Sequence, residues 1–218
     1  MADTDEFWAF FNSAAAPNLA LREKTFRKIF EYLDSQVGEV TIVETGCARQ
    51  AGNWAGDGQS TVLFDRYITA RDRYSKCYTV DISPVSVAEC RKLVSSRVQV
   101  TQQDSVQYLG ALTKELRGYN AINLLYLDSF DIDWIYWQPS AIHHLKELLA
   151  IRPLIDEFTL VVVDDCPQNI NFRPEPDGRA VVIGAPSVGG KGRLVAEFAS
   201  AVGAQMEFAD YQAGWTGF

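Results

Sequence analysis

Short apolar segments alternate with segments of helical periodicity from residue 39 onward, and this order restricts the folds that the chain can adopt. The helical segments cover residues 59–71, 84–94, 105–117 and 138–151. The apolar segments are EVTIVETG (39–46), KCYTVDIS (76–83), VQVTQQDS (98–105), INLLYLDS (122–129) and TLVVVDDC (159–166). Apolar segments of this kind are typical of parallel strands that are buried on both faces. The sequence therefore predicts a doubly wound, mostly parallel α/β sheet with helices on both faces.

Two regions stand outside this alternation. Residues 1–38 carry two helical patterns rich in aromatic side chains, and we expect them to form a cap or a dimer contact. Residues 167–188 contain four prolines and an Asp-Gly turn at Asp177, which predict an inserted hairpin or loop. Residues 39–218, with this insertion, are expected to form one domain.

The charge of the chain excludes some classes of partner. The 28 Asp and Glu residues outnumber the 20 Lys and Arg residues, which leaves a formal net charge of -8. Nucleic acids and anionic membrane surfaces repel such a protein, so neither is an expected partner. The first residues are acidic and unlike a secretory signal, and the four cysteines show no CxxC spacing. We therefore expect a cytoplasmic protein with reduced thiols.

A carboxylate closes every one of the five apolar segments. These acids are Glu44, Asp81, Asp104, Asp128 and the pair Asp164 and Asp165. The carboxyl ends of parallel strands share one edge of a sheet, and ligands bind at that edge. Helix capping is an alternative role for Asp81 and Asp104, but long loops follow Asp128 and Asp165. Because clustered carboxylates repel one another, a cation or a group rich in hydroxyl donors is expected among them.

The first loop argues against a nicotinamide dinucleotide. It reads ETGCARQAG and lacks the GxGxxG pattern of dinucleotide-binding folds. The next acid, Asp81, follows Glu44 by 37 positions, whereas the dinucleotide fingerprint places an acid about 20 residues on. A nucleoside that carries a positive charge fits these acids better.

On these residues the chain resembles the class I S-adenosylmethionine-dependent methyltransferases over residues 39–218, which implies a Rossmann-like, seven-stranded sheet. VETGCAR is similar to their first motif, so Glu44 and Gly46 would face the methionine end of the cofactor. Asp81 matches the acid that binds the ribose hydroxyls, and Asp104 and Ser105 match the adenine side. An insertion at residues 50–57 departs from the pattern. Ser60, in GQST at residues 58–61, would then begin the helix that binds the cofactor's carboxylate.

The acids after the fourth and fifth apolar segments resemble a metal site. LYLDS and VVVDDC are similar to the metal-dependent O-methyltransferases of the catechol and macrocin type. The resemblance implies that Asp128, Asp164 and Asp165 hold Mg²⁺, since neighbouring strand ends lie about 5 Å apart. The metal would lower the pKa of a hydroxyl on a small-molecule acceptor, and the resulting anion would attack the methyl group.

Three further residues are candidates for the catalytic base. Asp131 stands where the catechol type has a lysine, so it is either a base or a further metal ligand. His143 and His144 are adjacent on the helix at 138–151, and at most one of them can face the cleft. One of them would then act as the base, or both would be structural.

Two other functions fit parts of the sequence. A metal-dependent glycosyltransferase or phosphotransferase would use Asp131-Ile132-Asp133 as its DxD motif. A non-catalytic S-adenosylmethionine-binding protein would keep the fold and lack turnover. Lys191 and Arg193 are either solvated helix-start charges or contacts to an anionic acceptor.

Overall fold

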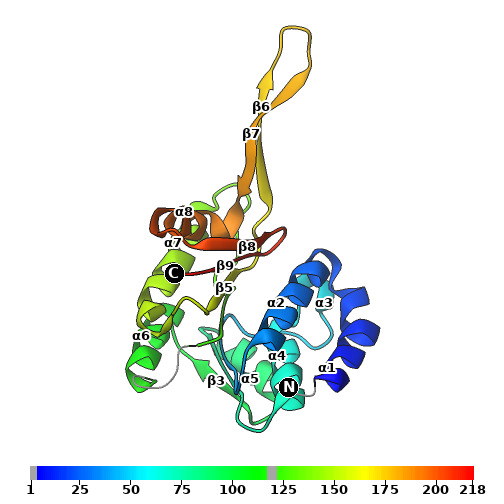
Figure 1. The fold of residues 1–218 in the computed structure, drawn as a ribbon, viewed down its shortest axis with the longest axis vertical. Helices are drawn as coiled ribbons and strands as arrows, with labels where there is room; N and C mark the ends of the chain where they lie inside the picture. Colours follow the sequence, from blue (N-terminus) through cyan, green and yellow to red (C-terminus); the bar gives the residue numbers. More distant parts are fainter. Residues whose placement is uncertain (1–3, 117–121) are drawn as a thin grey trace.

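A seven-stranded sheet forms the centre of the protein, as a computed structural model that describes residues 4–116 and 122–218 shows (Figure 1). The strands lie in the order β3-β2-β1-β4-β5-β9-β8. The first five strands along the chain pair in parallel, and β9 pairs antiparallel with both β5 and β8. Their bounds are β1 Thr41–Thr45, β2 Lys76–Asp81, β3 Val98–Gln102, β4 Leu124–Leu127, β5 Leu160–Val163, β8 Gln205–Ala209 and β9 Ala213–Thr216. The predicted fold class is confirmed.

Helices cover both faces of this sheet because neighbouring residues of each strand point to opposite faces. Ile42, Tyr126 and Val162 belong to one buried apolar cluster, and Val43 and Leu127 belong to the other. The helices are α3 Trp54–Asp57, α4 Ser60–Arg71, α5 Pro84–Leu93, α6 Ser105–Glu115, α7 Gln138–Ile151 and α8 Arg193–Val202, with short 3-10 turns η4 Arg152–Leu154 and η5 Gly190–Gly192. No helix within the described ranges has both the length and the apolar character needed to cross a membrane.

The N-terminal segment packs directly onto the sheet. It consists of α1 Asp5–Phe10, the short turns η1 Phe11–Ala15, η2 Ala16–Asn18 and η3 Ala20–Arg22, and α2 Glu23–Ser35, which lies beside α4 (Figure 1). The ring of Phe26 stacks on Tyr126 of β4 with the centroids 5.8 Å apart. Phe30 packs against Phe64 and Tyr67 of α4. Residues 5–35 therefore share one core with the sheet, and the predicted dimer contact stays a prediction.

A two-stranded hairpin extends away from the body of the molecule (Figure 1). It is made of β6 Gln168–Pro174 and β7 Ala180–Val188, which pair antiparallel. We call residues 170–186 the arm. Val188, at its base, is 5% exposed and belongs to the core, and Arg193 of α8 donates a hydrogen bond to Ser187. The arm thus rests on a base that is anchored to the body next to α8.

Candidate functional site

The carboxyl ends of β1, β2 and β4 surround one small cavity. Its lining consists of Gly46, Cys47, Arg49, Asp57, Ser60, Asp81, Asp128, Ser129 and Asp131. Five of these residues are site residues predicted from the sequence: Gly46, Ser60, Asp81, Asp128 and Asp131. They come from separate segments of the chain, and the parallel sheet brings them to one edge.

Glu44 organises the first loop from inside the protein. Its side chain is fully buried and accepts hydrogen bonds from Ser60 Oγ (2.5 Å) and Thr61 Oγ1 (2.6 Å) at the start of α4. Burial raises the pKa of Glu44 to about 7, against the hydrogen bonds from these hydroxyls. Both carboxylate oxygens are thus engaged within the protein. Glu44 links β1 to α4 across the inserted residues 50–57, which include the short helix α3.

Gly46 allows β1 and β4 to approach each other closely where they end. Its φ of +80° lies in the left-handed region, and a Cβ atom there would lie 2.4 Å from the carbonyl oxygen of Asp128. A side chain at this position would push the two strand ends apart. Asp81, at the end of β2, accepts hydrogen bonds from the backbone N–H groups of Ser83 (2.7 Å) and Cys47 (3.4 Å). These contacts hold its carboxylate against the cavity.

The two histidines have different environments. His143 is partly exposed, and its Nε2 lies 2.9 Å from Ser105 Oγ and 3.3 Å from Glu147 Oε1. The hydrogen bond with Glu147 raises the pKa of His143, against the effect of burial. His144 is fully buried beside the carbonyl oxygen of Ser140 (2.7 Å), and burial lowers its pKa to about 4. Of the two histidine candidates for the base, His143 is the accessible one.

Glu147 is a site residue that the sequence analysis missed. It is fully buried on α7 and accepts hydrogen bonds from Ser129 Oγ (2.5 Å) and Thr45 Oγ1 (3.2 Å), in addition to its contact with His143. The spacing of four residues between His143 and Glu147 on one helix was the available signal. Asp104, in contrast, caps α6 by accepting from Gln107 N–H at 3.0 Å, which is the alternative role considered for it.

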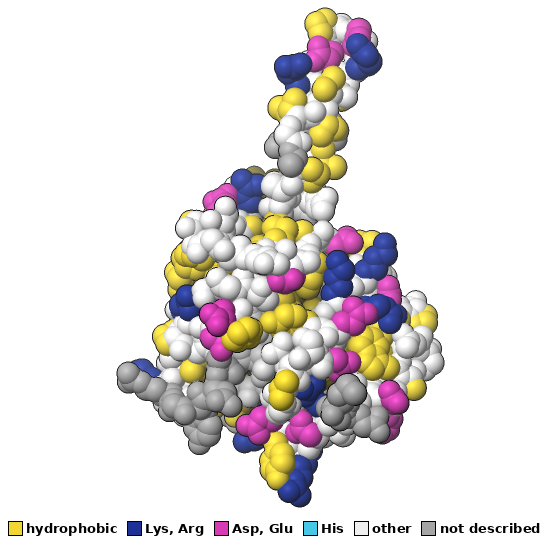
Figure 2. All heavy atoms as spheres, viewed as in Figure 1, with side chains coloured by type: hydrophobic (Ala, Val, Ile, Leu, Met, Phe, Trp, Pro, Cys, Tyr) yellow, Lys and Arg dark blue, Asp and Glu magenta, His cyan; other side chains and the backbone are white. Residues whose placement is uncertain are grey.

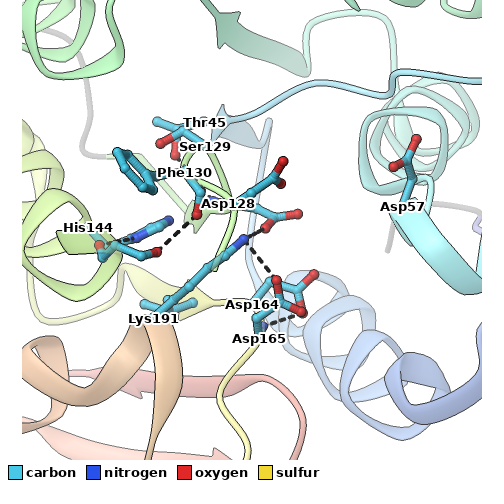
Figure 3. A network of polar contacts seen from close by, with 12 residues as sticks. Thr45, Asp57, Asp128, Ser129, Phe130, His144, Asp164, Asp165 and Lys191 are labelled. Atoms are coloured by element: carbon cyan, nitrogen blue, oxygen red, sulfur yellow. Dashed lines mark hydrogen bonds and ion pairs between the residues drawn. The ribbon is translucent and has the colours of Figure 1, made fainter. Parts of the chain in front are cut away.

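Basic side chains pair with the three acids that were expected to bind a metal, and Figure 3 shows one of them, Lys191, beside Asp128 and Asp165. Lys191 Nζ contacts Asp128 Oδ1 and lies 2.9 Å from Asp165 Oδ2. Arg22 Nε lies 2.7 Å from Asp164 Oδ2, and its Nη2 lies 3.2 Å from Asp165 Oδ1. Burial lowers the pKa of Lys191 and of Arg22, but the neighbouring carboxylates raise both above their ordinary values.

The predicted magnesium site therefore does not fit this arrangement. The ammonium of Lys191 occupies the position between Asp128 and Asp165 where a shared ion would bind, and Arg22 holds Asp164. Among residues 4–116 and 122–218, no group of three or more His, Cys, Asp or Glu side chains is placed to hold a metal ion. The expectation failed because sequence order does not reveal which cations fold onto an acid: Arg22 and Asp164 are 142 positions apart.

The DxD alternative also finds no support in the geometry. Asp131 is largely exposed and pairs with Arg49 (3.0 Å), and Asp133 accepts hydrogen bonds from the backbone N–H groups of Ile135 and Tyr136. Hydrogen bonds from these two N–H groups lower the pKa of Asp133. The two carboxylates therefore serve different partners and do not form one metal site. The pairing with Arg49 likewise leaves Asp131 without the role of metal ligand that the sequence suggested.

Lys191 differs from both of its expected roles, whereas Arg193 agrees with that of a helix-start charge. Lys191 is 1% exposed and is engaged by carboxylates, so an anionic acceptor cannot reach it. Arg193 pairs with Glu197 on the surface of α8 at 2.7 Å.

Comparison with known proteins relates this fold to solved structures. No protein-family model and no curated protein matches the sequence. The structure of the calicheamicin methyltransferase CalS11 is similar with a TM-score of 0.50, at 14% identity, over 98% of this chain and 91% of that one. A methyltransferase dependent on S-adenosylmethionine from Anabaena variabilis has a TM-score of 0.49 at 8% identity, covering 98% of this chain and 93% of that one. The resemblance predicted from the sequence is thus confirmed at the level of architecture: the chain has the fold of the S-adenosylmethionine-dependent methyltransferases.

Proposed function

We propose that this protein is an S-adenosylmethionine-dependent methyltransferase that acts on a hydroxyl group of a small molecule. The observation that carries the proposal is the cavity at the carboxyl ends of β1, β2 and β4, where Gly46, Ser60, Asp81 and Asp128 meet within a methyltransferase fold. When bound, the cofactor supplies a methyl group that its sulfonium charge activates for attack. An acidic cavity suits a ligand that combines this positive charge with ribose hydroxyls.

The residues along the cavity fit the cofactor by their chemistry. Asp81 is held at its edge by backbone N–H groups and offers a carboxylate to the ribose hydroxyls. Glu44 links β1 to Ser60 at the start of α4, and the partly exposed side chain of Asp128 gives negative charge beside the reactive end. Ser105 Oγ, at the start of α6, lies 2.9 Å from Nε2 of His143 on α7.

The loop that follows β4 supports a small apolar or aromatic acceptor. Four of its large hydrophobic side chains are exposed: Phe130, Trp134, Ile135 and Tyr136. This loop also carries Asp131, which lines the cavity. Exposed aromatic groups beside a polar cavity are typical of a surface that binds a ring and orients its polar substituent. A ring that carries a hydroxyl group fits this surface best.

His143 is the residue that we assign as general base. Its contact with the buried Glu147 stabilises the protonated imidazole, so that it can accept the proton of the acceptor hydroxyl. The centroids of the Phe130 and His143 rings are 5.4 Å apart, and this contact with the loop after β4 supports the assignment. His144 does not share this role because it is buried and hydrogen-bonded to the backbone.

Binding of S-adenosylhomocysteine, the product form of the cofactor, tests the proposal. We expect calorimetry to give one site per chain for the wild type, and a loss of affinity of about tenfold or more for Asp81→Ala, because the ribose hydroxyls lose a charged acceptor. Asp177→Ala at the exposed tip of the arm is the matched control and should bind like the wild type. Absence of binding by the wild type would overturn the cofactor assignment.

A further inference from the structure

We propose that Lys191 and Arg22 together take the place of a divalent metal ion at the acid cluster, so that this site works without one. The acid cluster consists of Asp128, Asp164 and Asp165. The role of these residues in a reaction rests on the proposed methyltransferase function. The metal-binding behaviour that the proposal predicts can be measured independently of that function.

The position of Lys191 is that of a shared ion. Its ammonium group bridges the carboxylates of Asp128 and Asp165, which follow two neighbouring strands of the sheet. The side chain is 1% exposed, and a lysine is rarely buried to this extent unless its charge is paired. Figure 3 shows it reaching across the ends of β4 and β5 toward both acids. A metal ion could bind these two acids only by displacing Lys191.

Glycines on both sides of Lys191 fix the backbone that delivers it. A Cβ atom at Gly190, where φ is +54°, would lie 2.1 Å from the carbonyl oxygen of Asp165. A Cβ atom at Gly189 would lie 2.4 Å from Pro167 O, and a Cβ atom at Gly192 would lie 2.4 Å from Cys166 Sγ. In addition, Lys191 N–H donates to Asp165 O at 3.2 Å. The main chain around Lys191 therefore lies against the segment that carries the acids, and only glycines permit this approach.

Arg22 completes the charge that a divalent ion would supply. Its guanidinium bonds to both Asp164 and Asp165, donates to Ala55 O at 3.2 Å and lies over the ring of Tyr211. Formally, three carboxylates with Lys⁺ and Arg⁺ carry one negative charge, which is the charge the same carboxylates would carry with Mg²⁺. The two side chains thus reproduce the electrostatic balance of a metal site in a fixed form.

The consequence for the reaction lies at Asp128. This residue lines the cavity with a partly exposed side chain, while Lys191 holds its Oδ1. Lys191 is therefore a positioning residue: it orients Asp128 toward the cavity and places a positive charge behind the carboxylate. A substitution that only unfolds the protein would not distinguish this role, so the test measures the exclusion of metal.

A titration of the 218-residue chain with Mn²⁺, followed by the electron paramagnetic resonance of the free ion, tests the proposal. Mn²⁺ is the probe because it prefers carboxylate oxygen ligands, as Mg²⁺ does. We expect no stoichiometric binding by the wild type or by Lys191→Arg, which keeps the charge. Lys191→Ala leaves an uncompensated negative charge among the acids, so it should bind one ion about tenfold more tightly or better than the wild type. Lys191→Gln provides a second uncharged variant if Lys191→Ala does not fold.

Two results would overturn the proposal. One is that the wild type binds one equivalent of Mn²⁺ and that Asp128→Asn abolishes this binding, because the metal would then have displaced Lys191. The other is a folded Lys191→Ala or Lys191→Gln variant with no gain in Mn²⁺ binding. In parallel, wild-type binding of S-adenosylhomocysteine should be equal in EDTA and in Mg²⁺. If S-adenosylhomocysteine does not bind at all, the proposed function fails, whereas the Mn²⁺ titration still decides the role of Lys191.

Discussion

Glu44 makes the stability of the protein depend on pH in a direction opposite to that of most carboxylates. Its pKa is about 7 in the folded protein because of burial, and 4.5 is its ordinary value. Between these two values the folded state keeps a proton that the unfolded chain has lost. The contribution of Glu44 to stability therefore falls as the pH rises through this window and is constant above it.

We predict that Glu44→Gln removes this dependence. A glutamine can accept and donate hydrogen bonds to Ser60 and Thr61 without a charge to bury. As the pH rises from about 5 to about 8, the free energy of unfolding of the wild type should fall relative to that of the variant by an amount on the order of 3 kcal/mol. Urea denaturation at both pH values measures it. A constant difference would show that Glu44 ionises normally.

The two histidines offer a second residue-scale prediction. They are the only histidines of the chain, so NMR should show two sets of imidazole signals. We expect one, which His143→Gln removes, to titrate above its ordinary pKa of 6.5, and the other to stay neutral down to about pH 4. Glu147→Gln should lower the pKa of His143, because the hydrogen bond that raises it loses its charge. Two ordinary titrations would remove the support for His143 as base.

At the scale of elements, the N-terminal segment is part of the domain and supplies part of the site. Phe26 and Phe30 of α2 are fully buried against β4 and α4, and Arg22 pairs with the fully buried Asp164. Burying each aromatic side chain contributes about 1.5–3 kcal/mol. Leaving Asp164 without its partner costs about 3–5 kcal/mol. Together these terms are comparable to the whole stability of a domain, about 5–15 kcal/mol.

A chain that begins at residue 39 should therefore not fold. We expect it to lack a cooperative unfolding transition, as observed by circular dichroism during urea denaturation. Arg22→Lys in the full chain tests the ion pair alone: it should fold with reduced stability, because lysine cannot contact Asp164 and Asp165 with a planar fork. A cooperative transition in the chain 39–218 would mean that the sheet is stable without α2.

The elements themselves were largely predictable, whereas the contacts between them were not. The apolar runs indicated β1 to β5 within a few residues, and the helical segment expected at 84–94 corresponds to α5. Of the acids at the strand ends, Asp81 and Asp128 line one cavity, and Lys191 joins Asp128 to Asp165, as the shared edge of parallel strands allows. Which partner each acid receives depends on the tertiary packing of residues far apart in the sequence. Apart from the glycines around Lys191, no local sequence pattern predicts that this residue bridges two acids.

At the scale of the whole molecule, the acidic charge of the chain is partly compensated where it is most concentrated. The acid cluster lies at one edge of the sheet, and two cations from distant segments are folded into it. The cavity beside it therefore has a limited negative charge, carried by side chains such as Asp81 and Asp128. An unpaired cluster of this size would oppose folding, while a neutral one would lose its attraction for a sulfonium ligand.

The arm is the part of the molecule that contributes least to this core. Figure 2 shows apolar side chains along its length and both acidic and basic side chains near its tip. Ile170, Val181, Val182 and Ile183 are each at least 40% exposed. The ion pairs Arg173 with Glu175 and Arg179 with Asp177 lie within the arm itself. Its stability therefore adds little to that of the body, since an isolated two-stranded hairpin is marginally stable in water.

We predict that the body keeps its stability and its ligand when the arm is shortened. Residues 171–185 would be replaced by an Asn-Gly turn, which suits a two-residue hairpin connection. The base at Gln168 and Val188, with its hydrogen bond from Gln168 Nε2 to Ala209 O, remains in place. The melting temperature should change by no more than about 4 °C, which corresponds to about 1 kcal/mol. Binding of S-adenosylhomocysteine should equal that of the wild type. A large loss of stability would mean that the exposed apolar side chains of the arm pack against the body or another chain in solution. Unchanged stability without binding of S-adenosylhomocysteine would mean that the arm belongs to the binding site.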